Sequence, residues 1–143
     1  MVRFKFGRGS ERVLTTVDPY IVHIFRKALA LGLVDISCVS GRRDKEEQNA
    51  LYYAEPQLSQ KRYPDSKHNT EPFSDAIDAF PYINGTASYK YEHCIYLAGI
   101  IMAIDKLDSD RLRWGGDWNR DGEAITDQCF QDLGHFELIE RIR

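Results

Sequence analysis

The chain has 143 residues, 43% of them hydrophobic, and a net charge of −3 at pH 7. Such a chain can bury a core without disulfide bonds, so we expect one domain over residues 1–143. The charge and the lack of a basic stripe with interleaved aromatic residues argue against nucleic-acid binding. No segment approaches the roughly 20 apolar residues that cross a bilayer, which argues against stable membrane association.

The cysteines and the N-terminal residues both favour synthesis in the cytosol. Cys38, Cys94 and Cys129 form no C-x-x-C pair. An odd number of cysteines without metal-ligand spacing favours reduced, buried thiols. Residues 1–8 lack the apolar run of a signal peptide. We therefore expect a protein that is made in the cytosol without a signal peptide.

The first expected elements are a core-facing helix and a strand. Asp18 and Pro19 make a favourable helix start, and apolar residues follow at helical spacing until Gly32 closes the segment. Residues 35–39 are expected to form a strand that follows this helix.

A second helix is expected directly after that strand. Asp44 with Glu47 three residues later resembles a capping box, and the helix would run through Leu51. Arg42 and Arg43 then lie in the turn between strand and helix. Such turns often present functional side chains.

The middle of the chain is expected to contain a loop and a second strand. Residues 55–64 carry prolines and polar residues without a clear period, so we expect a loop that leads to His68. Residues 75–80 are expected to form a strand, whose side chains alternate between its two faces. Asp78 then lies between two apolar neighbours, where a carboxylate is costly to bury unless a cation binds it. Asp75 lies on the other face.

The remaining elements complete an α+β fold. Ser88 is expected to cap a long helix that reaches about Leu107. Apolar residues cover nearly its whole circumference, which predicts a helix buried at the centre. Residues 112–114 and 135–139 are expected to be strands that join the earlier ones in a small antiparallel sheet packed with helices.

Two of the four histidines are candidate metal ligands together with Asp78. A catalytic zinc typically takes three protein ligands from histidine and carboxylate side chains and leaves a fourth position for water. His68, Asp78 and His135 would supply that set. His23 and His93 fall inside apolar helical patterns, and we interpret both as structural.

Three further residues complete the candidate site. A zinc hydrolase needs a carboxylate that takes the proton of the attacking water and passes it to the leaving amine, and Asp132 is the candidate. Glu137 shares a strand face with His135 and would orient that ring through its other nitrogen. Ser66 is assigned a supporting position beside His68.

Three short motifs resemble a known enzyme family. They are Ser66-x-His68, Ala76-x-Asp78 and Gly134-His135-x-Glu137, with an acid three residues before the last histidine. Their order is similar to that of the VanY-type D-Ala-D-Ala carboxypeptidases and L-alanyl-D-glutamate endopeptidases, above all the phage endolysins. The likeness continues through residues 4–7, 40–43, 75–78, 81–85 and 113–119.

The resemblance implies a fold and a set of roles. The fold would be the zinc peptidase fold that these enzymes share with the hedgehog signalling domains. His68, Asp78 and His135 match the family's zinc ligands, and Asp132 matches its catalytic carboxylate. Arg43 matches an arginine that faces the substrate, where its fork of donors suits a carboxylate or a developing oxyanion. Arg42, the adjacent residue, stays an alternative for this role.

The resemblance also implies an activity. It is that of a monomeric zinc-dependent endolysin that cuts the L-alanyl-D-glutamate bond of the peptidoglycan stem peptide, after release from the host cytoplasm. Two alternatives stay open: a D-Ala-D-Ala carboxypeptidase, and a non-catalytic binding module that carries zinc. Residues 69–74 lengthen the family's spacing between the first histidine and the aspartate. We expect this loop beside the cleft, where it would affect which substrate fits.

A second metal motif lies in the C-terminal third of the chain. Asp117, Asn119 and Asp121 carry side-chain oxygens at alternate positions and precede a glycine, as in the first half of a calcium loop. The twelfth position is Gln128 instead of a bidentate glutamate, although Asp127 is adjacent. The motif therefore predicts either a regulatory calcium site near the cleft or an acidic surface turn.

Overall fold

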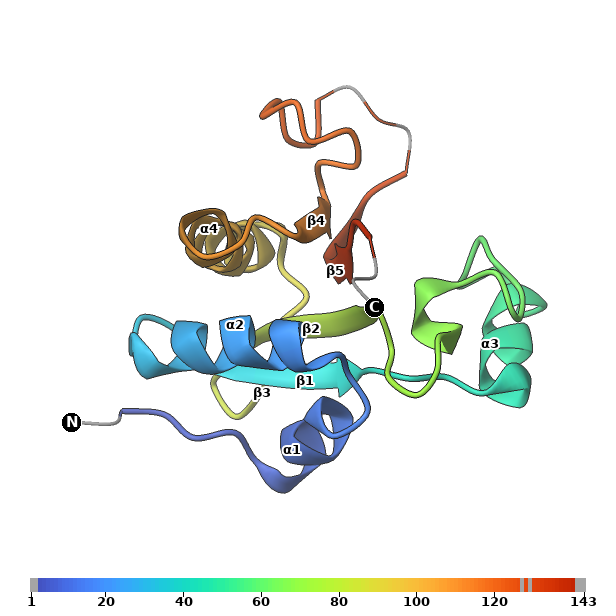
Figure 1. Cartoon of the computed structure of the whole chain (residues 1–143), viewed down its shortest axis with the longest axis horizontal. Helices are drawn as coiled ribbons and strands as arrows, with labels where there is room; N and C mark the ends of the chain where they lie inside the picture. The colour runs from blue at the N-terminus through green and yellow to red at the C-terminus, as the bar shows by residue number, and fades with distance from the viewer. Residues whose placement is uncertain (1–2, 127, 129, 141–143) are drawn as a thin grey trace.

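A five-stranded antiparallel sheet forms the frame of the described chain (Figure 1). The computed structural model describes residues 3–126, 128 and 130–140. The strands are β1 (Ile36–Ser40), β2 (Ala76–Ile83), β3 (Thr86–Ala87), β4 (Leu112–Gly115) and β5 (Asp132–Leu138). Their order across the sheet is β1-β2-β5-β4, and β3 pairs with the end of β2.

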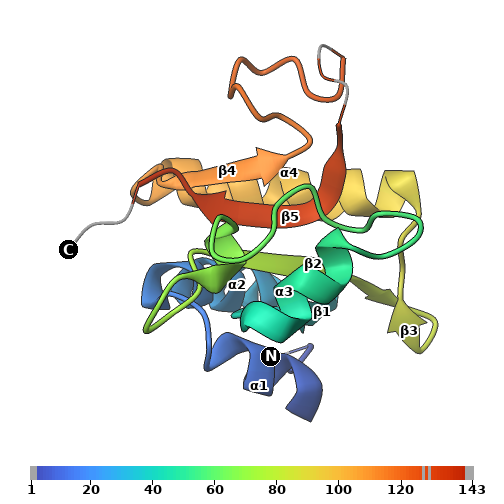
Figure 2. The ribbon, with the colours of Figure 1, turned by 90° about the vertical axis from the view of Figure 1, so that its right-hand side faces the viewer.

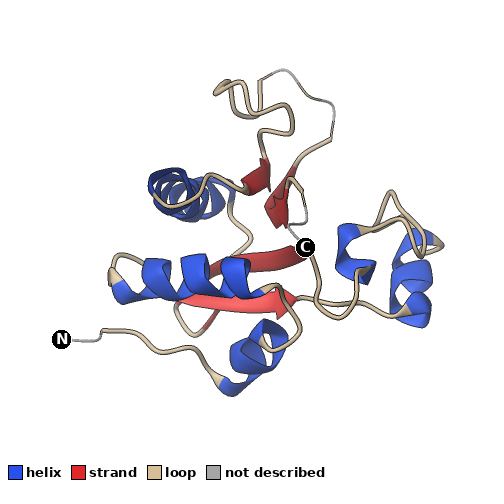
Figure 3. Cartoon of the chain, viewed as in Figure 1, coloured by secondary structure: helices blue, strands red, loops and turns tan. Residues whose placement is uncertain are grey.

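Helices pack around this sheet, as Figure 3 shows by colour. In the described residues they are α1 (Arg8–Leu14), α2 (Pro19–Ala30), α3 (Lys45–Tyr52), α4 (Tyr91–Leu107) and the 3-10 turn η1 (Lys67–Asn69). Helices α2 and α4 contact each other, α4 also contacts β2, β4 and β5, and α1 contacts β1. Helix α3 lies at one end of the sheet (Figures 1 and 2). The fold is α+β, as the sequence predicts.

Helix α2 has the ends that the sequence predicts. The side chain of Asp18 accepts a hydrogen bond from the Tyr20 N–H at 2.9 Å, and Pro19 occupies the first helical position. Gly32 follows the C-terminal end with φ of +71°, a left-handed conformation that favours glycine. The face that the helix buries consists of Ile21, Ile24, Phe25, Ala28 and Leu29.

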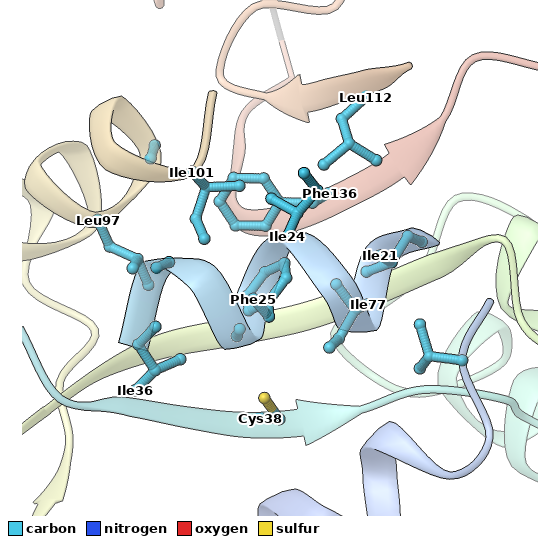
Figure 4. Packing of buried hydrophobic residues seen from close by; sticks show 14 of the residues in the cluster. Ile21, Ile24, Phe25, Ile36, Cys38, Ile77, Leu97, Ile101, Leu112 and Phe136 are labelled. Atoms are coloured by element: carbon cyan, nitrogen blue, oxygen red, sulfur yellow. The ribbon is translucent and has the colours of Figure 1, made fainter. Parts of the chain in front are cut away.

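The hydrophobic core lies where α2, α4 and the sheet meet (Figure 4). Phe25 of α2 meets Phe136 of β5 edge to face, with ring centroids 5.6 Å apart and planes at 80°. Ile77 of β2, Leu97 of α4 and Leu112 of β4 bury their side chains in the same cluster. Because burying one such side chain stabilises the fold by about 1.5–3 kcal/mol, this core fixes β2 and β5 relative to each other.

Helix α4 differs from the prediction in its start and in its burial. It begins at Tyr91, and the hydroxyl of Ser88 lies 2.7 Å from Nδ1 of His93 instead of capping the helix. Tyr96 is 51% exposed and Leu107 is 89% exposed, so the helix is not central. Apolar residues do surround it, but α2 and the sheet cover only one side. Nowhere in the described chain is a helix both long and apolar enough to cross a membrane.

The two cysteines in the described residues are buried and unpaired. Cys38 lies in the core, where burial raises the pKa of its thiol to about 12. Burial also raises the pKa of the Cys94 thiol. Both thiols are therefore buried, as expected, and their raised pKa values disfavour the reactive thiolate. Cys129 lies outside the described residues.

A buried carboxylate ties α4 to β4. Asp105 is fully buried and accepts hydrogen bonds from the Tyr20 hydroxyl at 2.6 Å and from the N–H groups of Arg111 and Leu112 at 3.0 Å each. Burial and the bond to Asp105 raise the pKa of Tyr20 to about 12, so its hydroxyl stays a donor. The helical pattern of the sequence does not reveal this role, because Tyr20 is distant in the chain.

Replacing Asp105 by Ala is expected to lower the free energy of unfolding by about 3 kcal/mol or more, because three donors lose a charged acceptor. Urea unfolding followed by circular dichroism measures the change. Lys106→Ala is the control, since it removes only an exposed pair with Asp110 at 2.9 Å and should change stability by less than about 0.5 kcal/mol. Similar losses for the two variants would contradict the role of Asp105.

Candidate active site

Strands β2 and β5 bring two of the candidate ligands face to face. Asp78 lies opposite His135 in the antiparallel ladder between these strands. Their neighbours Ile77 and Phe136 are fully buried in the core. Because side chains alternate along a strand, Asp78 and His135 lie together on the opposite face of the sheet.

The third candidate ligand comes from η1, and the start of this turn is capped. The Ser66 hydroxyl accepts a hydrogen bond from the His68 N–H at 3.2 Å, and the Ser66 N–H donates to Oδ1 of Asn69 at 3.1 Å. Nδ1 of His68 lies 2.7 Å from the Gly41 carbonyl oxygen. Since a carbonyl only accepts, Nδ1 carries the hydrogen and Nε2 of the neutral ring carries a lone pair.

The buried ring nitrogen Nε2 of His68 faces a carboxylate oxygen, an arrangement that a cation bound between them would suit. Nε2 of His68 is buried, has no hydrogen-bond partner in the described chain, and lies 3.3 Å from Oδ1 of Asp78. Nδ1 of His135 lies 3.1 Å from the same oxygen. The ligand atoms of all three residues lie within 4.8 Å of one another. Two imidazole nitrogens and a carboxylate oxygen are a donor set that could hold a metal ion.

The electrostatics of this group also favour a cation. Burial raises the pKa of Asp78, but His68 and His135 outweigh burial and bring that pKa well below its usual range. Burial lowers the pKa of His135, but hydrogen bonds to Asp78 and Glu137 outweigh burial and raise it to about 9. The surroundings of the His135 ring therefore favour positive charge, which a metal ion could supply in place of a proton.

Glu137 lies where the sequence predicts it. Its Oε1 is 2.9 Å from Nε2 of His135, the ring nitrogen that faces away from Asp78. Burial raises the pKa of Glu137, but His135 and then Lys67 lower it to about 2. The carboxylate is therefore ionised near neutral pH and can accept the Nε2 hydrogen, which leaves Nδ1 of His135 to act as a ligand.

Asp132 lies at the start of β5 and lines the same cleft as the three candidate ligands. Burial and the charge of Asp78 raise its pKa, because both disfavour a second carboxylate there. The register between β4 and β5 shifts after Trp114, so that Gly115 of β4 lies opposite Asp132. A Cβ atom at Gly115 would lie 2.1 Å from the Asp132 carbonyl oxygen, so only glycine lets the strands approach this closely.

Arg43 lies in the cleft, and its guanidinium group is already engaged. Its Nη2 lies 2.6 Å from Oδ2 of Asp78, and its Nε donates to the Ser40 hydroxyl at 3.0 Å. Arg42, the alternative left open by the sequence, pairs with Glu71 at 2.6 Å and does not line the cleft. Arg43 is therefore the arginine at the site, and it contacts a candidate ligand directly.

Gln48 contacts Arg43 in this site, a role that the sequence did not predict. It is fully buried on α3, and its Oε1 accepts a hydrogen bond from Nη1 of Arg43 at 3.2 Å. Its Nε2 donates to the Ser59 hydroxyl at 2.9 Å and to the Lys61 carbonyl at 2.5 Å. One amide thus connects Arg43 to a wall of the cleft. A glutamine in a polar helix gave no signal of burial.

Replacing Gln48 by Leu is expected to lower the free energy of unfolding by about 2 kcal/mol, because Arg43, the Ser59 hydroxyl and the Lys61 carbonyl each lose a hydrogen bond to the buried amide. Thermal and urea unfolding measure the effect. Gln57→Leu, an exposed position in the loop after α3, is the matched control and should leave stability nearly unchanged. Equal stability of both variants would show that the Gln48 amide holds nothing in place.

The three candidate ligands line a cleft that has a volume of about 1090 Å³. Trp118 lines it and lies 5.6 Å, ring centroid to ring centroid, from His135. Trp114, which lies four residues before Trp118, is instead buried in the core, and Tyr82 does not line the cleft. Phe80, Tyr89 and Phe130 line the cleft instead.

The lengthened loop lies elsewhere than expected. All of residues 69–74 are described, and none of them lines the cleft. Ser74 exchanges backbone hydrogen bonds with Thr16 and Asp18 at 2.8 and 2.9 Å. The loop is therefore held against the segment before α2, and the expectation that it lies beside the cleft was wrong.

The candidate calcium loop projects beyond the sheet between β4 and β5 (Figures 1 and 2). Oxygens of Asp117, Asn119 and Asp121 accept hydrogen bonds from backbone N–H groups inside the loop. Gln128 accepts from the Trp118 N–H at 3.0 Å and so fastens the loop. Asp127 lies outside the described residues. Calcium binding here stays a prediction.

Comparison with known proteins gives one consistent result. The family model described as phage L-alanyl-D-glutamate peptidase matches residues 1–139. The L-alanyl-D-glutamate peptidase of Escherichia phage T5 is 34% identical over 141 residues, which cover 95% of this chain and 98% of that protein. The crystal structure of the Serratia marcescens L-Ala D-Glu endopeptidase ChiX resembles this structure with a TM-score of 0.69 and 25% identity, over 93% of this chain and 88% of that chain.

Proposed function

This chain belongs to the phage L-alanyl-D-glutamate peptidase family, and we propose that it hydrolyses the bond between L-alanine and D-glutamate in the peptidoglycan stem peptide as a zinc enzyme. One observation carries the zinc assignment. The buried Nε2 of His68 has no hydrogen-bond partner in the described residues and converges with Asp78 and His135. Two histidines and one carboxylate are the ligands that catalytic zinc takes in many hydrolases.

His68, Asp78 and His135 would hold the zinc ion. A bound zinc ion supplies Lewis-acid chemistry, which makes water a nucleophile near neutral pH and draws electron density from a carbonyl. Glu137 and the Gly41 carbonyl orient the two imidazole rings. Such supporting contacts are worth about 10–100-fold in metal affinity or activity.

Asp132 is the proposed proton carrier. It takes the proton of the attacking water and returns it to the departing amine of D-glutamate. Its raised pKa suits this role, because a carboxylate with a higher pKa is a stronger base for the proton of the attacking water. The role is supported by the position of Asp132 in the lining of the cleft that the three proposed ligands also line.

Arg43 is the proposed electrostatic partner of the reaction. Its contacts with Ser40, Gln48 and Asp78 hold its guanidinium group rigidly at the edge of the cleft. A fixed positive charge there stabilises the negative charge that develops on the scissile carbonyl oxygen. The contact with Asp78 supports a second role, in which Arg43 would orient this proposed ligand.

We further propose that the enzyme acts as an endolysin on the bacterial wall. Mass spectrometry of peptidoglycan fragments after digestion by the zinc-loaded protein tests the activity. Stem peptides cut between L-alanine and D-glutamate, absent from a digest with Asp132→Asn, are the expected products. Release of free D-alanine would instead identify a D-Ala-D-Ala carboxypeptidase. An intact polymer after treatment with zinc-loaded protein would favour a binding module.

A further inference from the structure

Two basic side chains flank Glu137 at the edge of the cleft. Lys67 of η1 places Nζ 3.2 Å from Oε2 of Glu137, and Arg113 of β4 places Nε 3.5 Å from the same oxygen. The other carboxylate oxygen, Oε1, contacts His135. Both basic residues line the cleft together with the proposed zinc ligands. This pair stands next to the reaction site but has no part in the mechanism above.

The local charge balance leaves a positive excess. Lys67 and Arg113 carry two positive charges. Among the described residues, each forms an ion pair with the same single carboxylate, that of Glu137. Their side chains are 29% and 30% exposed, whereas Glu137 is 13% exposed. An arriving ligand therefore meets the cations before it meets the carboxylate. This differs from Arg43, whose side chain is 14% exposed and bound to Asp78.

The proposed substrate carries an anion at a matching place. In the stem peptide, D-glutamate continues the chain through its side-chain carboxyl group, so its α-carboxylate stays free. That carboxylate is bonded to the same carbon as the nitrogen of the scissile bond. Arg113 lies opposite Glu137 in the sheet, two residues along β5 from His135, a separation of about 6.6 Å along a strand. An anion next to the scissile bond thus falls within reach of the Arg113 side chain.

We propose that Lys67 and Arg113 form the subsite that binds the free α-carboxylate of the D-glutamyl residue. This inference rests on the proposed function and names the contact that selects D-glutamate after the scissile bond. The planar fork of Arg113 suits a carboxylate, and the ammonium group of Lys67 adds a second charge. Backbone contacts keep both residues in place: Lys67 donates to the Ile139 carbonyl at 3.3 Å, and Arg113 donates to the Trp118 carbonyl at 3.3 Å.

The test compares two substrates that differ in one group. One is a soluble stem peptide with the free α-carboxylate, and the other carries a neutral amide there, as in D-isoglutamine. The zinc-loaded wild-type enzyme is expected to have a kcat/KM about tenfold or more higher for the carboxylate, the effect of one hydrogen bond between charged groups. In Arg113→Gln and Lys67→Gln this preference should fall to within about threefold of unity, mainly through KM.

A matched control separates this subsite from a general effect of charge. Lys61 lines another wall of the cleft and is exposed, so Lys61→Gln should keep the wild-type preference. The ratio of the two substrates within one variant cancels changes in folding or zinc content. A wild-type enzyme without preference, or a preference that survives in both Arg113→Gln and Lys67→Gln, would overturn the subsite alone. Cleavage of neither substrate by the wild type would overturn the proposed function and the subsite with it.

Discussion

Asp132→Asn is expected to lower kcat by about 10²–10⁴-fold, the range that general acid–base catalysis contributes. The amide has nearly the shape of the carboxylate but cannot take a proton from water at neutral pH. Because Asp132 is not among the three converging ligands, the variant should bind zinc as the wild type does. Cleavage of a stem peptide and zinc content, measured on the same preparation, check both expectations.

A surface substitution of the same kind serves as the control for Asp132. Asp65 is exposed before η1 and does not line the cleft, so Asp65→Asn should retain wild-type turnover. If Asp132→Asn kept most of its activity, the base would be another group. If it lost zinc together with activity, Asp132 would be a ligand, and its assignment as proton carrier would be wrong.

His68→Ala is expected to have the other large effect, because it removes one of the three proposed ligands. Loss of a residue that merely supports a ligand already weakens metal binding or activity by about 10–100-fold, so loss of a ligand should weaken zinc binding by more than about 100-fold. Zinc titration against a competing chelator measures this without reference to activity. Turnover should fall in parallel at limiting zinc.

His93→Ala is the matched control for the loss of a histidine. His93 lies on α4, contacts the Ser88 hydroxyl and belongs to no metal-binding group among the described residues. The His93→Ala variant should therefore bind zinc as tightly as the wild type. Equal zinc affinity of the His68 and His93 variants would exclude His68 as a ligand. Folding of both variants is checked by circular dichroism.

Local signals in the sequence predicted two of the helices and the strand that carries Asp78. The Asp18 cap and the proline after it set the start of α2, and alternation along residues 75–80 put Asp78 and Asp75 on opposite faces of a strand. Asp44 caps α3 through a bond from the Glu47 N–H at 2.8 Å, as expected. Each of these features depends on residues within a few positions of one another. The family resemblance was also confirmed.

Features that depend on distant contacts were not predicted. Gln48 gave no sign of its burial, because its partners Arg43 and Lys61 meet it only in the folded chain. The same holds for the ion pair between Arg43 and Asp78, residues that are 35 positions apart. Burial of α4 was overestimated, since a helix with apolar residues all round can still be covered on one side. Periodicity describes the helix but not its neighbours.

Zinc dependence of cleavage at a defined bond tests the central claim most directly. The protein is stripped of metal with a chelator, and peptidoglycan is digested with and without one equivalent of zinc, with mass spectrometry of the fragments. We predict that zinc restores cleavage between L-alanine and D-glutamate in the wild type, and that it does not in His68→Ala. Equal cleavage by the metal-free protein, or zinc-restored cleavage at a different bond, would contradict the account.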